Sequence, residues 1–216
     1  MKLEQLNWFA LFGGILILLL LPISIYFSWW HLIAGKNLLT VNVSPVNTNI
    51  NLLGTQFSPP LIWAMNLTGI LTFLASGIIM LIYALIPAKP YSIDLLGFGY
   101  RKPFYAVVLY LVGLLVMTFA TRALLGQGIP ITGSANLTLP SKMTMNADIS
   151  VLVTSAFQWP FYLGIVAAGL CITARVYHTK LAKVANKASR ETIALQATPT
   201  AEKEIIKPIL NQTLQN

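Results

Sequence analysis

The sequence has very little of the chemistry on which most catalytic and transport sites depend. It contains one cysteine, Cys171, and two histidines, His31 and His178, in 216 residues. A single cysteine cannot form an intramolecular disulfide, and it excludes an oxidoreductase built on a reactive cysteine pair. Charged residues make up only 9% of the chain. Soluble domains carry about 25%, so the composition argues against one.

Apolar residues are abundant, and they gather in four long runs. These runs cover residues 7–30, 60–86, 103–121 and 150–174. A helix of about 20 residues crosses a hydrocarbon core about 30 Å thick. The runs therefore predict an all-α integral membrane protein whose four helices form an antiparallel bundle within residues 1–175. The first run is too long for a cleavable signal segment, so we expect it to remain as the first helix.

The four runs contain no acidic or basic side chain. A proton-coupled carrier needs such a group near the midplane, and a di-iron or copper site needs clustered His and carboxylates. His31 and His178 flank different runs on opposite predicted sides, so they cannot hold one haem together. The sequence therefore favours a non-catalytic protein over an enzyme, and it predicts no cofactor.

The distribution of Lys and Arg predicts the orientation. Counted up to Arg190, nine of them precede the first run, separate the second from the third or follow the fourth, against three in the other two connections. Because Lys and Arg stay on the cytoplasmic side, both termini are predicted to be cytoplasmic in a multi-pass plasma-membrane protein. The net charge of +8 then indicates contact with anionic headgroups rather than nucleic acid. Tyr26, Phe27, Trp29 and Trp30 are expected to anchor the outer end of the first helix.

The two outer loops, 31–59 and 125–149, carry strand patterns. Residues 40–44 and 48–52 alternate apolar and polar side chains around Pro45, which is the pattern of a β-hairpin. The second loop offers a third strand, so a small extracytoplasmic β-containing cap is predicted. Asn42 and Asn136 begin acceptor sequons in these loops and are possible glycosylation sites.

The segments on the inner side are predicted to be simpler. Residues 88–102 read as a short loop, with Pro103 in the first turn of the third helix. Residues 176–195 are predicted to form a basic juxtamembrane helix, and residues 196–216 a disordered cytoplasmic tail.

The polar groups inside the runs are few and uncharged. Small residues and hydroxyls are how helices pack in lipid, and most of these groups fit that role. The alternative is a quinone or lipid slot lined by Asn66, Thr72 and Tyr110.

Cations at the ends of the runs are candidates for lipid or partner binding. They are Arg122, Lys180, Lys183, Lys187 and Arg190. Arg122 lies in apolar sequence at the outer boundary, and three roles are open to it. It can extend to outer phosphates, pair with Asp148, or bind an anionic ligand or partner carboxylate.

Four spans with a strand-bearing first outer loop resemble, in outline, the plan of claudins or tetraspanins. The tryptophan and paired-cysteine signatures of those outer loops are missing, so their function is not carried over. The first hypothesis is a structural or accessory subunit of a larger membrane complex, with other membrane subunits as partners. The alternatives are a quinone-interacting respiratory subunit, a neutral-solute permease and a cell-surface interaction protein.

Overall fold

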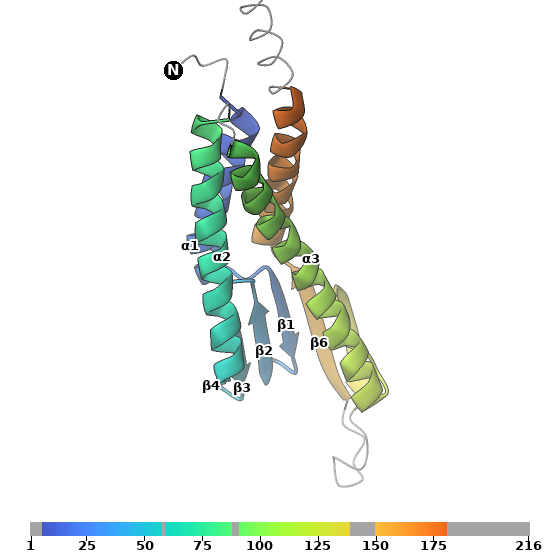
Figure 1. Ribbon diagram of the computed structural model, residues 1–216. Coiled ribbons are helices and arrows are strands. Elements are labelled where there is room, and N and C mark those ends of the chain that lie inside the picture. Colours follow the sequence, from blue (N-terminus) through green and yellow to red (C-terminus); the bar gives the residue numbers. More distant parts are fainter. Residues whose placement is uncertain (1–5, 58, 88–90, 139–149, 181–216) are drawn as a thin grey trace, which may run out of the picture.

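The computed structural model describes residues 6–57, 59–87, 91–138 and 150–180. In these residues the structure has four long apolar helices, and a six-stranded antiparallel sheet lies toward one end of them (Figure 1). We call this end of the molecule the sheet end. The opposite end, where Leu6 and Lys180 lie, is called the far end.

The helices are α1 (Trp8–Tyr26), α2 (Pro60–Leu85), α3 (Ser92–Leu125) and a C-terminal helix (Trp159–Lys180). All four are long and apolar enough to cross a membrane, as the sequence predicts. At 1.5 Å per residue, α1 is about 28 Å long and α3 about 51 Å. Consequently α3 continues well past the sheet-end terminus of α1 (Figure 1).

Local chemistry sets the helix ends. The side chain of Asn7 caps α1 by accepting a hydrogen bond from the Ala10 amide at 3.2 Å. Pro60 occupies the first turn of α2, where its missing N–H costs nothing. Gly126 ends α3 in the left-handed conformation, with φ of 73°, which glycine adopts without strain.

The start of α3 corrects the sequence interpretation. The helix begins at Ser92, so the predicted loop over residues 88–102 and the predicted start at Pro103 are wrong. Gly99, which suggested a loop, instead allows a close helix crossing. A Cβ there would lie 2.8 Å from the sulfur of Met80 on α2. Lys102 therefore belongs to a helix and not to a connection.

The ends of two apolar runs are strands and not helix. The fourth run begins with β6 (Ser150–Phe157), and its helix starts only at Trp159. The first run ends as helix at Tyr26, and Trp30 opens β1. Trp29 and Trp30 are fully buried, so the expectation that they anchor the boundary is wrong. Apolar length alone cannot separate a buried strand from the end of a span.

The sheet combines strands from two connections, the one between α1 and α2 and the one between α3 and the C-terminal helix. Its strands are β1 (Trp30–Ala34), β2 (Leu39–Val43), β3 (Thr48–Leu52), β4 (Thr55–Phe57), β5 (Gly133–Thr138) and β6, in the order β4-β3-β2-β1-β6-β5. The predicted hairpin is confirmed as β2 and β3, with Thr40 opposite Asn51. The second connection adds two strands where one was expected, because β6 comes from the predicted fourth span.

The two faces of the sheet differ in chemistry. On the inner face Trp30, Leu32 and Ala34 are buried, and they pack with Leu114 of α3. On the outer face His31, Asn42 and Asn49 lie side by side on β1, β2 and β3. The alternation along β2 and β3 therefore places Val41, Val43 and Ile50 toward the helices and the asparagines on the opposite face.

Trp29 connects the sheet to the bundle. Its indole nitrogen donates a 2.7 Å hydrogen bond to the Ser24 hydroxyl of α1. Its ring centroid lies 6.2 Å from that of Phe73 on α2, 5.3 Å from Tyr110 on α3 and 6.1 Å from Phe161 on the C-terminal helix. One buried side chain thus contacts all four helices at the point where the sheet meets them.

A hydrogen-bonded cluster holds the far end together. The Asn7 amide donates to the Tyr83 hydroxyl and to the Ala174 carbonyl, both at 3.0 Å. The Tyr83 hydroxyl also lies 2.8 Å from Nδ1 of His178. These residues are buried and come from α1, α2 and the C-terminal helix. The cluster therefore fixes three helices relative to one another.

Tyr83→Phe is expected to lower the free energy of unfolding by about 1–3 kcal/mol, because Asn7 and His178 then lose a buried partner. Thermal or denaturant unfolding in detergent measures this loss. Tyr91→Phe is the matched control, since Tyr91 is 52% exposed, and it should change stability by less than about 0.5 kcal/mol. Equal effects of the two variants would contradict the role given to the cluster.

Candidate functional site

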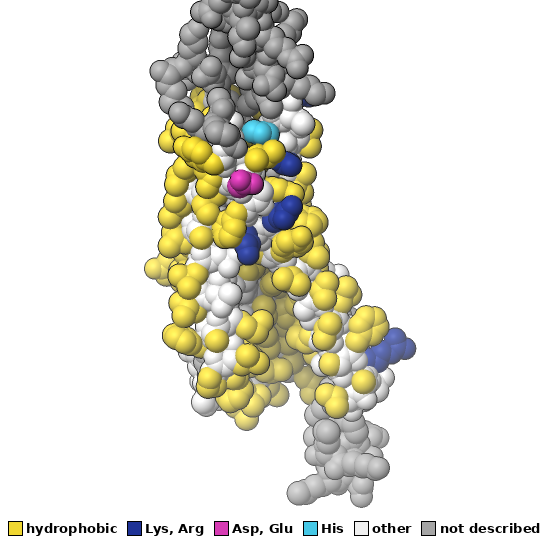
Figure 2. Space-filling model, in the orientation of Figure 1, with side chains coloured by type: hydrophobic (Ala, Val, Ile, Leu, Met, Phe, Trp, Pro, Cys, Tyr) yellow, Lys and Arg dark blue, Asp and Glu magenta, His cyan; other side chains and the backbone are white. Residues whose placement is uncertain are grey.

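A groove opens between α2 and α3. The two helices meet where the Ser76 hydroxyl donates a 2.6 Å hydrogen bond to the Gly99 carbonyl, and they separate toward the sheet end. The groove between them has a volume of about 620 Å³. Figure 2 shows the hollow from outside. The inner face of the sheet, through Val41, Val43 and Ile50, forms part of its wall.

The groove brings together the three residues of the predicted slot. Asn66 and Thr72 line it from α2, and Tyr110 lines it from α3. The Tyr110 hydroxyl donates to the Val43 carbonyl at 3.1 Å, which ties α3 to the sheet at this point. An apolar hollow of this size with a few polar groups is typical of small-molecule sites. That a ligand binds here stays a prediction.

Both helices that border the groove expose large apolar side chains near the sheet. We call this set the α2/α3 face, and it consists of Leu61, Trp63 and Met65 on α2 with Val116, Phe119 and Leu124 on α3. Their exposed fractions lie between 60% and 77%. Figure 2 shows apolar side chains along both helices on either side of the hollow. The α2/α3 face is therefore apolar, although it lies beside a sheet whose outer face carries His31, Asn42 and Asn49.

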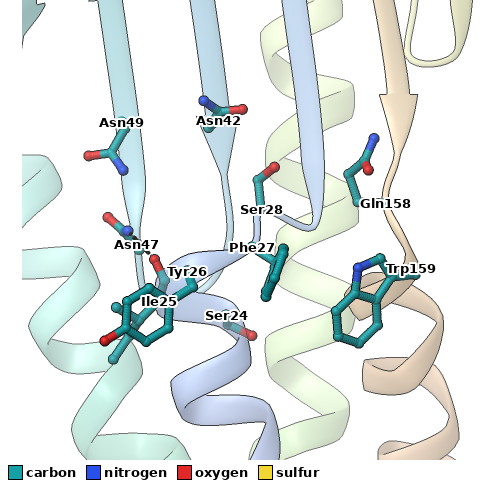
Figure 3. A pocket seen from close by; sticks show the side chains of 10 residues that line it. All are labelled: Ser24, Ile25, Tyr26, Phe27, Ser28, Asn42, Asn47, Asn49, Gln158 and Trp159. Carbon is teal, nitrogen blue, oxygen red and sulfur yellow. Dashed lines mark hydrogen bonds between the residues drawn. The ribbon is translucent and has the colours of Figure 1, made fainter.

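A second and smaller pocket, of about 210 Å³, lies where α1 ends (Figure 3). Amide side chains line it from the sheet side, and Phe27 and Trp159 line it from the helix ends. Those two ring centroids are 5.4 Å apart. The ten side chains that line the pocket carry no formal charge.

The two outer sequons occupy different positions in the sheet. Asn42 is half-buried on β2, and the Ser44 hydroxyl of the same sequon is buried and donates to the Ser24 carbonyl at 2.8 Å. Asn136 is exposed on the edge strand β5. Asn136 is therefore the more accessible acceptor in the folded chain, and glycosylation at either position stays a prediction.

Of the five predicted cationic residues, the structure describes two, Arg122 and Lys180. Arg122 is exposed in the last turn of α3, and Lys180 is exposed at the end of the C-terminal helix. Asp148 lies outside the described residues, so its pairing with Arg122 stays a prediction. The same holds for the roles of Lys183, Lys187 and Arg190, which also lie outside the described residues.

The sequence interpretation missed one group of residues. Arg101, Lys102 and Arg175 line a single cleft of about 590 Å³ between α3 and the C-terminal helix. The preference of Lys and Arg for the cytoplasmic side already accounts for these three cations, so the sequence gives no reason to place them in a binding site. The signal that could have found them is the position of two adjacent cations directly before an apolar run that continues in the same helix.

In the part of the chain that the structure describes, no three His, Cys, Asp or Glu side chains lie close enough together to hold a metal ion. Every buried side-chain nitrogen and oxygen in that part has a hydrogen-bond partner. No protein-family model and no curated protein matches the chain. A function must therefore come from the groove, the α2/α3 face and the cleft themselves.

Proposed function

We propose that the chain is an integral protein of the cell membrane, with both termini in the cytoplasm, and a non-catalytic structural or accessory subunit of a larger membrane complex. The observation that carries this proposal is the exposure of the α2/α3 face beside the sheet. On this proposal the face is covered by another membrane subunit.

The level of the face supports a protein cover. α1 ends at Tyr26, whereas residues 60–69 of α2 and 110–125 of α3 continue beside the sheet for about 14 Å and 22 Å. At that level the outer face of the sheet carries His31 and Asn42, which are costly to place in hydrocarbon. Lipid that surrounds α1 therefore ends near Tyr26. Exposed apolar patches beyond lipid mark protein–protein interfaces.

The continuity of the face supports a partner that is itself a membrane protein. Exposed apolar side chains continue along α3 from the face toward the far end, through Val112 and Leu109. A partner helix running parallel to α3 can therefore cover residues both beside the sheet and within the span. Large aromatic side chains such as Trp63 and Phe119 are the residue types that dominate binding energy at such interfaces.

The test is gentle detergent extraction followed by native mass measurement. The intact chain is expected to co-purify with another subunit, and the double variant Trp63→Ser, Phe119→Ser should weaken that association at least about tenfold. The matched control is Ile165→Ser with Val166→Ser, because these residues are 45% and 52% exposed on the C-terminal helix, away from the face. A wild-type monomer, or equal loss in the control, would contradict the proposal.

A second candidate is a small apolar ligand, such as a quinone, held in the groove. The observation that favours it is the position of Asn66, Thr72 and Tyr110 around one apolar hollow. Mass measurement of the chain from gentle extracts tests it by detecting a bound quinone or lipid. Thr72→Val should reduce the retained ligand, and Thr173→Val, an exposed threonine on the C-terminal helix, should not.

A further inference from the structure

The cleft between α3 and the C-terminal helix concentrates positive charge. Arg101 and Lys102 line it from α3, and Arg175 lines it from the opposite wall. Figure 2 shows Lys and Arg side chains gathered on this surface of the bundle, with an acidic group near them. That acidic group is Asp94, the only carboxylate in the described part of the chain, and it lines the same cleft. Three cations against one carboxylate leave a formal charge of +2.

The position of these cations along the helices makes them costly. Arg101 lies nine residues after the start of α3, about 14 Å along its axis, and Arg175 lies sixteen residues after Trp159, about 24 Å along the C-terminal helix. Both helices are long and apolar enough to span a membrane. Cations within such helices require a partner of opposite charge or a wet cavity, and they commonly mark a functional site.

Aromatic side chains hold two of the cations in place. The Arg101 guanidinium carbon lies 5.8 Å from the ring centroid of Tyr100, and its Nε donates to the Tyr100 hydroxyl at 3.4 Å. The Lys102 ammonium lies 5.0 Å from the ring centroid of Phe98. Cation–π contacts orient these groups at little cost. The Arg101 guanidinium and the Lys102 ammonium are therefore held beside rings that line the cleft.

We propose that this cleft binds a phosphate group through Arg101, Lys102 and Arg175. A guanidinium presents a planar fork of donors that matches two phosphate oxygens, and an ammonium adds a point charge. Basic pockets between membrane helices are a known form of site for lipid headgroups. The cleft and the α2/α3 face share no residue, so this inference stands apart from the subunit role.

An anionic phospholipid is the source of the phosphate that the surroundings favour. Lys102 and Tyr105 line both the basic cleft and the apolar groove. A headgroup phosphate in the cleft therefore places the start of an acyl chain beside the groove. A free phosphate compound has no group to fill that apolar space.

The test uses the full chain in nanodiscs and four probes: phosphatidylglycerol, a hexosyl-diacylglycerol without phosphate, glycerol phosphate and inorganic phosphate. Native mass measurement of retained lipid, with titration of the soluble probes, gives relative affinities. Phosphatidylglycerol should bind at least about tenfold more tightly than the sugar lipid. If the soluble phosphates bind as tightly as phosphatidylglycerol, the site takes a free phosphate compound. Equal retention of the sugar lipid overturns the proposal.

Variants separate the cleft from general surface charge. Arg101→Gln, Lys102→Gln and Arg175→Gln should each weaken phosphatidylglycerol binding about tenfold. Lys36→Gln is the control, because it removes an exposed lysine from the turn between β1 and β2 at the sheet end and should change binding less than twofold. Arg101→Lys keeps the charge and the fold but removes the fork, and it should bind with intermediate affinity. Equal weakening by Lys36→Gln and the cleft variants overturns the proposal.

Discussion

Trp29→Ala is expected to lower the free energy of unfolding by about 3–5 kcal/mol. The indole is fully buried and contacts aromatic rings on α2, α3 and the C-terminal helix. Its removal leaves a cavity where the sheet joins the bundle, and the Ser24 hydroxyl loses its donor. Denaturant unfolding of the purified protein in detergent measures the effect.

Trp159→Ala is the control, because Trp159 is 48% exposed at the start of the C-terminal helix. It should cost less than about 1 kcal/mol. Loss of the sheet should accompany loss of stability in Trp29→Ala alone, so far-ultraviolet circular dichroism, which reports secondary structure, should change for that variant more than for the control. A Trp29→Ala protein as stable as the control would refute the role of the indole as the junction.

Gly69→Ala is expected to displace the turn between β2 and β3, at a cost of about 1–3 kcal/mol or more. A Cβ on Gly69 would lie 1.9 Å from the carbonyl oxygen of Pro45, and that contact is with backbone, which cannot rotate away. The turn must therefore move off α2. Faster hydrogen exchange at the amides of β2 and β3, with a lower unfolding temperature, would report the change.

Gly169→Ala provides the comparison. Gly169 also lies within a helix, and a Cβ there meets no atom within 4 Å. Because alanine is the better helix former, this substitution should be neutral or should stabilise by about 0.5–1 kcal/mol. If Gly69→Ala behaved in the same way, the turn would not be held against α2.

The features that the sequence predicted well are those that depend on local pattern. The four apolar helices follow from long runs without charge, and the hairpin follows from alternation around Pro45. Each signal is contained within about 20 residues, and each reflects which face of an element is apolar. Asn66, Thr72 and Tyr110 also line one groove, and ligand binding by them stays a prediction.

The features that it missed depend on contacts between distant segments. Pro103 and Gly99 carry a turn signal, yet they lie inside α3, where packing on α2 compensates for weak local propensity. The strand β6 reads as the beginning of a span because apolar side chains occupy both of its faces: Val153 is buried against the helices, and Leu152 is 56% exposed on the opposite face. The sequence does not predict the cleft of Arg101, Lys102 and Arg175, because the turn signals before Pro103 place the first two cations in a loop and not in α3.

The order of the strands has a consequence for how the protein is made. β1 lies at the centre of the sheet, where Trp30 pairs with Val43 on one side and with Phe157 on the other. During synthesis β1 can pair early with β2, which follows it directly in the chain. Its pairing with β6 must wait until α2, α3 and β5 have been synthesised. During that interval β1 presents an open edge, which is a template for pairing with other chains. Chains interrupted before residue 150 should therefore be recognised by quality control as unfinished, even with three helices in place.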